Sequence, residues 1–155
     1  MKTYVMIPTY NERENIGNLL REILNLKIPD LHVVVVDDNS PDGTSEIVKS
    51  LAKEHPEVEL LLRTTGRGRG SAGIAGFKYA LEHGADCVVE MDADFSHHPR
   101  YIPSFLEAIQ GADMVIGSRA VAGGKDINRG IARRVITFLA GVYVKMLLGL
   151  KIKDV

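Results

Sequence analysis

Five short apolar runs constrain the fold of this chain more than any other feature. They read YVMI, HVVVV, VELLL, CVVEM and DMVIG, and most of them lack the alternation of a strand with one face in water. Continuous apolar strands are typical of a parallel sheet that is covered on both faces. Segments with helical periodicity separate several of the runs, as βαβ units require. The sequence therefore predicts an α/β fold with a Rossmann-like, doubly wound, mainly parallel sheet.

Four helices are expected between and after these runs. The first follows Asn11, and the spacing from Asn11 to Glu14 is that of a capping box. Two further helices are expected near residues 45–54 and 72–83, and a fourth begins near Pro99, a favourable residue for a first turn. The fourth helix should bury its apolar positions Ile102, Phe105, Leu106 and Ile109.

The chain has the length and composition of one globular domain. Its 155 residues are 45% hydrophobic, enough for one sizeable core. The single cysteine, Cys87, excludes an internal disulfide and disfavours a thiolate metal site, so we expect a reducing compartment. The first residues contain no apolar run of signal-peptide length, and no signal peptide is expected.

Charge is distributed unevenly along the chain. The net charge is −6 up to Asn128 and +5 after it. We assign residues 1–128 to the main domain and residues 129–155 to a basic, apolar C-terminal helix region of the same domain. That region contains VITFLAGVYVKMLLGL, which is shorter than the roughly 20 apolar residues of a spanning helix. It should contact a membrane surface or a second copy of the chain, with an ordinary buried helix as the alternative.

Polar or glycine-rich segments follow all five apolar runs. They read PTYNE, DDNSPDG, RTTGRGRGSAG, DADFSHH and GSR in chain order. In an open α/β sheet, ligands bind beyond the carboxyl ends of the strands. The sequence therefore predicts one functional site at that edge of the sheet.

The segment DAD places two carboxylates, Asp92 and Asp94, at positions i and i+2. If extended geometry persists, both point to the same side and suit a hard divalent cation, Mg²⁺ or Mn²⁺, that keeps positions open for phosphate oxygens. An acid-rich surface turn is the alternative explanation. A zinc site that uses His97 and His98 is disfavoured, because adjacent histidines on a turn rarely face one ion.

Asp37 and Asp38 are consecutive at the end of the second run and should point to opposite sides. One carboxylate is then available to accept hydrogen bonds from a base or a ribose, while the other caps the turn NSPDG. The alternative is that both carboxylates only satisfy amides of the turn.

The segment GRGSAG, residues 68–73, matches the G-x-G-x-x-G pattern of dinucleotide-binding enzymes, with Asp92 about twenty residues further on. That fingerprint belongs to the first βα turn, however, and here it follows the third apolar run. Arg67 and Arg69 among these glycines suit a diphosphate instead. A nicotinamide enzyme is therefore the weaker interpretation, and the basic residues lack the interleaved aromatic side chains that would favour nucleic-acid binding.

The ordered blocks IPTYNERENI, VVVDDNSPDGT, GSAGIAGFKYAL, MDADFSHHP and IGSRAVAGG resemble the family-2 glycosyltransferases that act on polyprenyl phosphates, such as dolichol-phosphate mannosyltransferase. The resemblance covers nearly the whole chain. It implies a nucleotide-sugar domain of the GT-A type. The family continues after KIKDV with a TSGFR-like block, so we expect the chain to be truncated at its C-terminus.

The resemblance also implies roles for individual residues. Those expected to bind the nucleotide-sugar donor are Pro8, Tyr10, Glu12, Val36, Asp38, Asp92, Ala93, Asp94, Arg119 and Arg133. Asp92, Asp94 and Ser96 are expected nearest the metal. Asp92, Asp94 and Arg119 are expected to be catalytic, with Arg119 and Arg133 facing the phosphates of the donor or acceptor.

The implied reaction is the inverting transfer of a hexose, mannose or else glucose, from GDP-mannose or UDP-glucose to a polyprenyl phosphate. The acceptor oxygen is already anionic near neutral pH, so no strong general base is required. The expected location is cytoplasmic and peripheral, with the basic tail at the membrane face. The alternative is a catalytically incomplete nucleotide-sugar-binding domain that needs a further segment or a partner.

Overall fold

The computed structural model describes residues 1–118, 140, 142, 143 and 146. The chain divides into two compact units, Met1–Glu107 and Ala108–Val155, and each is described by itself. The boundary predicted after residue 128 falls outside the described residues, as do Arg119 and Arg133.

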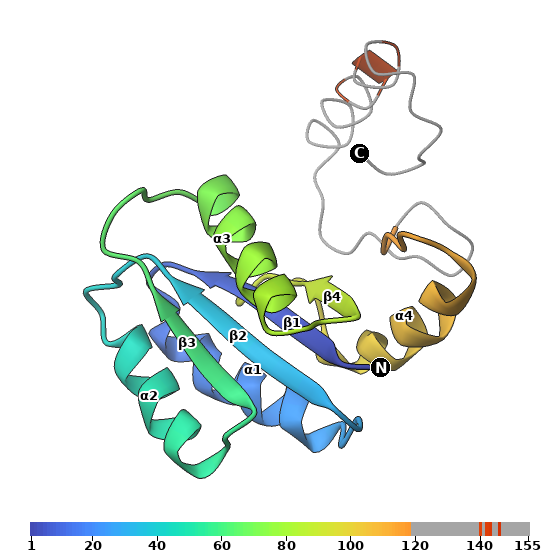
Figure 1. The fold of residues 1–155 in the computed structure, drawn as a ribbon. Helices are drawn as coiled ribbons and strands as arrows, with labels where there is room; N and C mark the ends of the chain where they lie inside the picture. The colour runs from blue at the N-terminus through green and yellow to red at the C-terminus, as the bar shows by residue number, and fades with distance from the viewer. Residues whose placement is uncertain (119–139, 141, 144–145, 147–155) are drawn as a thin grey trace. The chain divides into compact units, whose positions relative to one another are not determined.

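The first unit contains one sheet of four parallel strands in the order β3-β2-β1-β4 (Figure 1). The strands are β1 (Thr3–Thr9), β2 (Leu31–Asp37), β3 (Val58–Leu62) and β4 (Cys87–Glu90). The helices that alternate with them are α1 (Arg13–Asn25), α2 (Thr44–Glu54) and α3 (Arg69–Glu82). A 3₁₀ turn, η1 (Pro99–Tyr101), leads into α4 (Ile102–Ala108), and a second one, η2 (Ile109–Gly111), follows it. The predicted parallel α/β sheet is confirmed.

Helices cover both faces of the sheet, so two separate cores form. Val33 and Val35 pack with the apolar residues of α1 and α2, whereas Val34 and Val36 pack under α3. All four valines have no exposed surface. Burial of a valine side chain contributes roughly 1.5–3 kcal/mol, which explains why this strand has no polar position between Val33 and Val36. The doubly wound arrangement that the apolar runs predict is therefore present.

Gly76 allows α3 to approach the sheet closely. A Cβ atom at this position would lie 2.4 Å from Cγ of Met6 and 2.9 Å from a methyl carbon of Val36. Both distances are shorter than any normal contact, so only glycine fits. The first turn of α3 consequently lies beside the carboxyl ends of the strands.

The capping box predicted at Asn11 and Glu14 is wrong. Helix α1 begins at Arg13, and Asn11 adopts a left-handed backbone conformation with a φ of 61°. The amides of this turn are bound instead by side chains of the β2–α2 loop. Ser40 Oγ accepts from the amide of Asn11, Thr44 Oγ1 from that of Glu12 and Asp42 Oδ2 from that of Arg13, each at 3.0 Å. The capping groups are thus distant in sequence, where a local pattern does not reveal them.

The fifth predicted strand, residues 113–117, is also wrong. The structure assigns these residues, which lie in the second unit, to no helix or strand. An apolar run becomes a strand only when a neighbour satisfies its backbone groups. The predicted fourth helix starts near Pro99 with the 3₁₀ turn η1, which continues into α4. Of the positions expected to be buried, only Ile102 is buried, whereas Phe105, Leu106 and Ile109 are half-buried.

The second unit is described only in part. Of the apolar segment at residues 135–150, the structure describes residues 140, 142, 143 and 146, and all four are helical. Among the described residues, no helix combines the length and hydropathy needed to cross a bilayer.

Candidate functional site

A cavity of about 580 Å³ lies at the carboxyl ends of β1 and β4. The chain runs from β1 to β2 on one side of the sheet and returns to β4 on the other, so β1 and β4 flank the point where the strand order reverses. Open α/β sheets bind ligands at such a point. The residues that line the cavity are Pro8, Thr9, Tyr10, Glu12, Asp38, Arg67, Gly68, Arg69, Ala72, Asp92, Ala93 and Asp94.

The turn after β1 supplies one wall of the cavity. Tyr10 is half-exposed, and the guanidinium of Arg67 lies 5.8 Å from the centre of its ring, within the range of a cation–π contact. Glu12 immediately precedes α1 and accepts a hydrogen bond of 2.9 Å from the amide group of Asn15. An exposed aromatic ring beside an arginine offers both a stacking surface and a positive charge to a ligand.

Asp92 and Asp94 both line the cavity, although β4 ends at Glu90. Asp94 is exposed, and hydrogen bonds from the hydroxyl and the backbone amide of Ser96 lower its pKa. Ala93 between the two acids is buried. Asp94 is therefore an ionised carboxylate at neutral pH, as a cation ligand must be.

The two histidines after the acids point to different partners. Nδ1 of His97 accepts from the amide of Asp92 at 3.1 Å, whereas Nδ1 of His98 lies 3.8 Å from a carboxylate oxygen of Glu22 on α1. Among the described residues, no three His, Cys, Asp or Glu side chains are arranged to hold one metal ion. The described side chains thus offer no closed zinc site of the kind that uses both histidines.

Asp37 and Asp38 have different roles, as their consecutive positions predict. Asp37 is fully buried and accepts three hydrogen bonds, from the Thr9 hydroxyl at 3.0 Å and from the amide and hydroxyl of Ser40 at 2.9 and 2.6 Å. Asp38 instead lines the cavity. Asp37 therefore holds the turns after β1 and β2 together, and Asp38 is the carboxylate that faces the ligand side.

The β3–α3 loop is attached to the cavity through Asp38. The backbone amide of Gly68 donates to Asp38 Oδ2 at 2.7 Å. Nη1 of Arg63 lies 2.8 Å from Asp38 Oδ1, an ion pair whose two atoms are not aligned for a hydrogen bond. Arg63 also donates to the Ser71 hydroxyl at 2.7 Å and to the carbonyl of Gly66. Both carboxylate oxygens of Asp38 are therefore engaged by this loop, and a ligand gains access to them only if the loop shifts.

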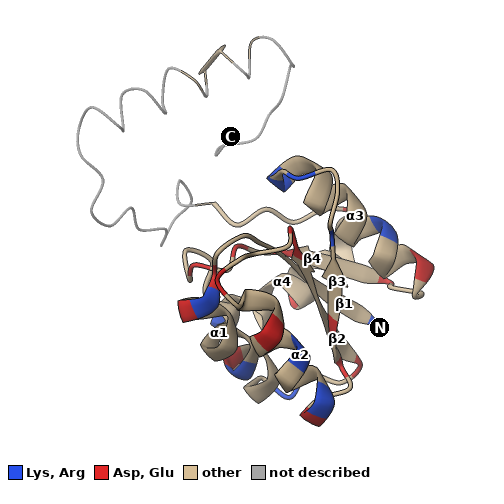
Figure 2. Cartoon of the chain, turned by 90° about the vertical axis from the view of Figure 1, so that its left-hand side faces the viewer, with Lys and Arg blue, Asp and Glu red and all other residues tan. Residues whose placement is uncertain are grey.

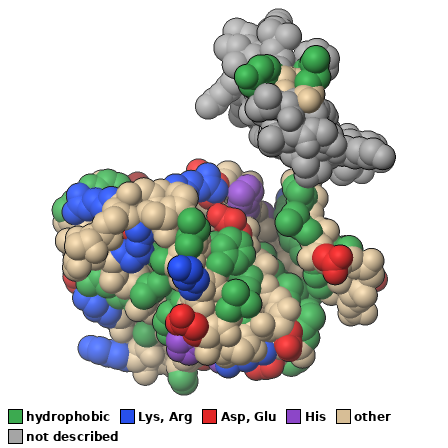
Figure 3. Space-filling view, turned by 45° about the horizontal axis from the view of Figure 1, so that its top comes forward, with side chains coloured by type: hydrophobic (Ala, Val, Ile, Leu, Met, Phe, Trp, Pro, Cys, Tyr) green, Lys and Arg blue, Asp and Glu red, His purple; other side chains and the backbone are tan. Residues whose placement is uncertain are grey.

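Positive and negative charges meet at the start of α3. Arg69, the first residue of the helix, forms an ion pair with Asp92, with 2.6 Å between Nη2 and Oδ1. In Figure 2 a basic segment at the beginning of α3 lies near acidic segments at the strand ends. Near the top of the folded body in Figure 3, basic, acidic and histidine side chains lie beside one another on the surface.

Some predicted site residues lie elsewhere. Val36 is buried under α3 and does not line the cavity. Ser96 does not line the cavity either, but its backbone amide donates a hydrogen bond to Asp94, which does. Arg119 and Arg133 are outside the described residues. Conversely, sequence reasoning missed Thr9, Ala72 and the anchoring role of Arg63, for which no local pattern exists.

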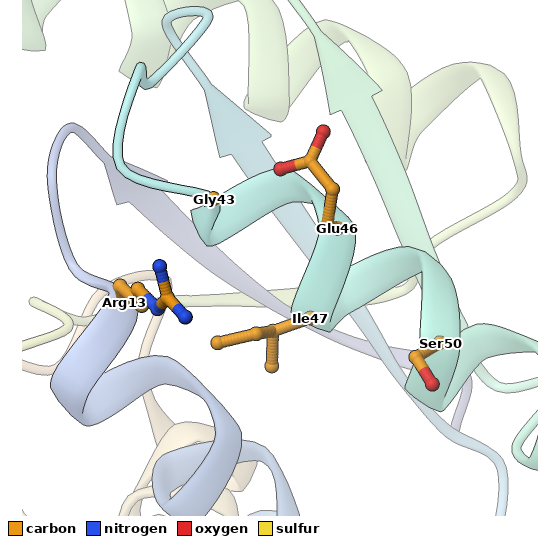
Figure 4. A pocket seen from close by; sticks show the side chains of 5 residues that line it. All are labelled: Arg13, Gly43, Glu46, Ile47 and Ser50. Carbon is orange, nitrogen blue, oxygen red and sulfur yellow. The ribbon is translucent and has the colours of Figure 1, made fainter.

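A second hollow, of about 390 Å³, lies between the first turns of α1 and α2 (Figure 4). Arg13, Gly43, Glu46, Ile47 and Ser50 line it. It contains none of the carboxylates that follow the strands. The cavity at the end of β1 and β4 is therefore the candidate functional site.

Comparison with known proteins shows the family of the chain. The model of glycosyl transferase family 2 matches residues 4–153. The chain belongs to this family. An undecaprenyl-phosphate mannosyltransferase from Micrococcus luteus is 46% identical over all of this chain, which spans 63% of that protein. A dolichol-phosphate mannosyltransferase from Pyrococcus furiosus is 47% identical over 88% of this chain and 38% of that protein.

A solved structure, S. aureus TarS 1-349, supports the fold of this member of the family. It superimposes with a TM-score of 0.55 at 26% identity, over 71% of this chain and 33% of that one. The chain thus has the GT-A type of fold that the family resemblance implies. It spans 63% or less of the length of each relative described above.

The carboxylates of the cavity at the ends of β1 and β4 suit a hard divalent cation. Asp92 and Asp94 provide carboxylate oxygens, and Mg²⁺ commonly binds through one or two carboxylates while substrate phosphates and water complete its coordination. A third protein ligand is not required for such a site. The arrangement therefore fits a cation that binds together with a diphosphate.

Proposed function

We propose that this chain carries the donor site of a metal-dependent, inverting glycosyltransferase that transfers a hexose from a nucleoside diphosphate sugar to a polyprenyl phosphate. Mannose is the proposed sugar, with glucose as the alternative. The observation that carries the proposal is the presence of Asp92 and Asp94 in the same cavity as Tyr10, Asp38 and two arginines of the β3–α3 loop. Two of the relatives are an undecaprenyl-phosphate mannosyltransferase and a dolichol-phosphate mannosyltransferase, which supports the acceptor class and mannose.

The nucleoside is proposed to bind between the turn after β1 and the β3–α3 loop. Tyr10 offers its exposed ring, and Asp38 offers a carboxylate to a base or ribose hydroxyl. Because Asp38 is buried by Gly68 and Arg63, the loop must shift when the nucleoside enters. The loop glycines permit such a shift at little steric cost.

The diphosphate is proposed to lie near Asp92 and Asp94. A bound Mg²⁺ or Mn²⁺ would neutralise the charge that develops on the departing diphosphate. Arg67 and Arg69 line the same cavity and are proposed to contact phosphate oxygens. From the family resemblance, Arg119 and Arg133 are also proposed to contact phosphate oxygens. The hydrogen bonds from Ser96 orient Asp94 and keep it ionised.

The acceptor phosphate is proposed to attack the anomeric carbon from the side opposite the diphosphate. Its oxygen is anionic near neutral pH, so none of the carboxylates in the cavity has to act as a strong base. The basic, apolar region at residues 129–155 is proposed to hold the lipid phosphate at the cytoplasmic face of a membrane.

Thermal unfolding with nucleotides tests the donor site. GDP, UDP, GDP-mannose, UDP-glucose and NAD are each added with and without Mn²⁺, and the melting temperature is followed by circular dichroism because the chain has no tryptophan. A ligand at 100 times its Kd stabilises the folded state by about 2.7 kcal/mol. We expect a metal-dependent shift with GDP or UDP compounds and none with NAD.

Two variants make the test specific. Asp94→Asn removes one carboxylate from the cavity and should abolish the metal-dependent shift, whereas Asp113→Asn makes the same change at an exposed position outside the cavity and should preserve it. A shift that survives in Asp94→Asn would refute this assignment. Transfer of labelled mannose to a polyprenyl phosphate then separates a complete enzyme from a domain that only binds the donor.

A further inference from the structure

The ion pair between Arg69 and Asp92 occupies one of the two carboxylates proposed to bind the metal. Nη2 of Arg69 lies 2.6 Å from Oδ1 of Asp92, and both residues line the cavity. A divalent cation at Asp92 would lie within a few ångströms of this guanidinium, and two such positive charges repel each other strongly in a partly desolvated cleft. The cation and Arg69 therefore compete for Asp92.

The exposure and the contacts of Arg69 distinguish it from the other arginines of the loop. Its side chain is 65% exposed, whereas that of Arg63 is 11% exposed and contacts both Asp38 and Ser71. Arg67 lies over the ring of Tyr10. Release of Arg69 from Asp92 breaks one hydrogen bond and leaves α3 in place, because the helix is held by the close packing at Gly76.

We propose that Arg69 is an exchangeable counter-ion: it neutralises Asp92 in the empty site and turns to the donor diphosphate when a divalent cation takes Asp92. This inference rests on the proposed function. It predicts that Arg69 opposes the binding of the cation alone but favours the binding of the diphosphate once the cation is present. The two ligands would then bind cooperatively, and residue 69 would account for part of that coupling.

Arg69→Gln should change the two affinities in opposite directions. Binding of Mn²⁺ without nucleotide, measured by the electron paramagnetic resonance signal of the free ion, should tighten two- to fivefold, roughly the worth of an exposed ion pair. Binding of GDP at saturating Mn²⁺, measured by calorimetry, should weaken roughly tenfold, because a charge-assisted hydrogen bond is lost. A residue that only supports the fold would not tighten one ligand while it weakens the other.

Arg67→Gln is the matched control. It removes the same charge from the same loop, but Arg67 contacts Tyr10 and not Asp92. It should tighten the binding of Mn²⁺ alone less than Arg69→Gln does, which separates direct competition for Asp92 from a general effect of net charge. Arg69→Lys keeps a positive charge and should restore part of both wild-type affinities.

The outcomes separate the two proposals. If the wild-type chain binds GDP with Mn²⁺ but Arg69→Gln binds Mn²⁺ alone no more tightly than the wild type, the exchange is refuted and the proposed function stands. If the wild-type chain binds no nucleotide with Mn²⁺, the proposed function fails, and the exchange fails with it. A wild-type chain that binds Mn²⁺ only with GDP supports the exchange when Arg69→Gln binds the ion without nucleotide.

Discussion

Replacement of Gly76 by alanine should destabilise the first unit, although alanine is the better helix former. The added Cβ would lie 2.4 Å from Cγ of Met6, 3.0 Å from its sulfur and 2.9 Å from a methyl carbon of Val36. Both neighbours are completely buried in the sheet, and Val36 has a stiff, β-branched side chain, so neither can move away freely.

The expected magnitude follows from two opposing effects. Alanine in a helix gains about 0.5–1 kcal/mol over glycine. Insertion of a methyl group into a closely packed interface costs roughly 1–3 kcal/mol, and contacts this short place Gly76→Ala at the upper end. We therefore expect a net loss of about 1–2 kcal/mol in the free energy of unfolding.

Urea unfolding followed by circular dichroism measures this loss. Gly70→Ala is the matched control, because Gly70 lies in the same helix and its Cβ would have no neighbour within 4 Å. Gly70→Ala should leave the midpoint unchanged or raise it. Met6→Ala removes the main obstacle, so the double variant should be more stable than the sum of the two single losses predicts.

The reasoning is refuted if Gly76→Ala is as stable as the wild-type chain. It is also refuted if the losses in Gly76→Ala and Met6→Ala simply add. Either result would mean that α3 is not held against the sheet by the close approach at Gly76.

Three further predictions follow from the hydrogen-bond network. Burial opposes ionisation of Asp42, but hydrogen bonds from the Thr44 hydroxyl and from backbone amides outweigh it and lower the pKa of Asp42. Asp42→Ala should therefore lower the free energy of unfolding in urea by about 1–2 kcal/mol at pH 7. The difference from the wild-type chain should shrink below about pH 4, because the carboxylate protonates there. Burial and a hydrogen bond to Glu59 raise the pKa of Tyr79 to about 12, so its stabilising effect is present below about pH 10 and is lost as pH rises towards 12. In an absorbance titration at 295 nm, Glu59→Gln should bring ionisation of a tyrosine to lower pH, and an unchanged curve would contradict this. Asp37→Ala should lower the free energy of unfolding by about 3 kcal/mol, because it leaves buried hydrogen-bond donors without partners. A decrease of no more than about 0.5 kcal/mol, which is typical of a surface substitution, would contradict this role of Asp37.

Much of the fold was predictable because burial leaves a periodic pattern in the sequence. The run from Val33 to Val36 predicts a strand covered on both faces, and the structure confirms it. The fifth run failed for a physical reason: an apolar run reports hydrophobicity, but a strand also requires a neighbour that pairs with it. The same limit applies to the cap of α1, whose partners lie about 30 residues away in the next loop.

The location of the candidate site was also predictable, but its internal contacts were not. Parallel strands bring their carboxyl ends to one edge, so the polar segments that follow them must lie near one another. This argument predicts that Asp38, Asp92 and Asp94 line one cavity, as the structure shows. It does not predict which polar atom each carboxylate meets.

The sequence by itself thus determined the alternation of the first four strands with helices, the family, and the edge of the sheet where the acidic residues lie, because local periodicity and strand ends express these features directly. Only the tertiary structure decided that Asp38 accepts a hydrogen bond from the amide of Gly68 and that Asp92 forms an ion pair with Arg69. It also decided that residue 76 must be glycine. These contacts join segments 23 to 70 residues apart. These contacts depend on how closely α3 packs on the sheet, and that packing depends on the shapes of both surfaces.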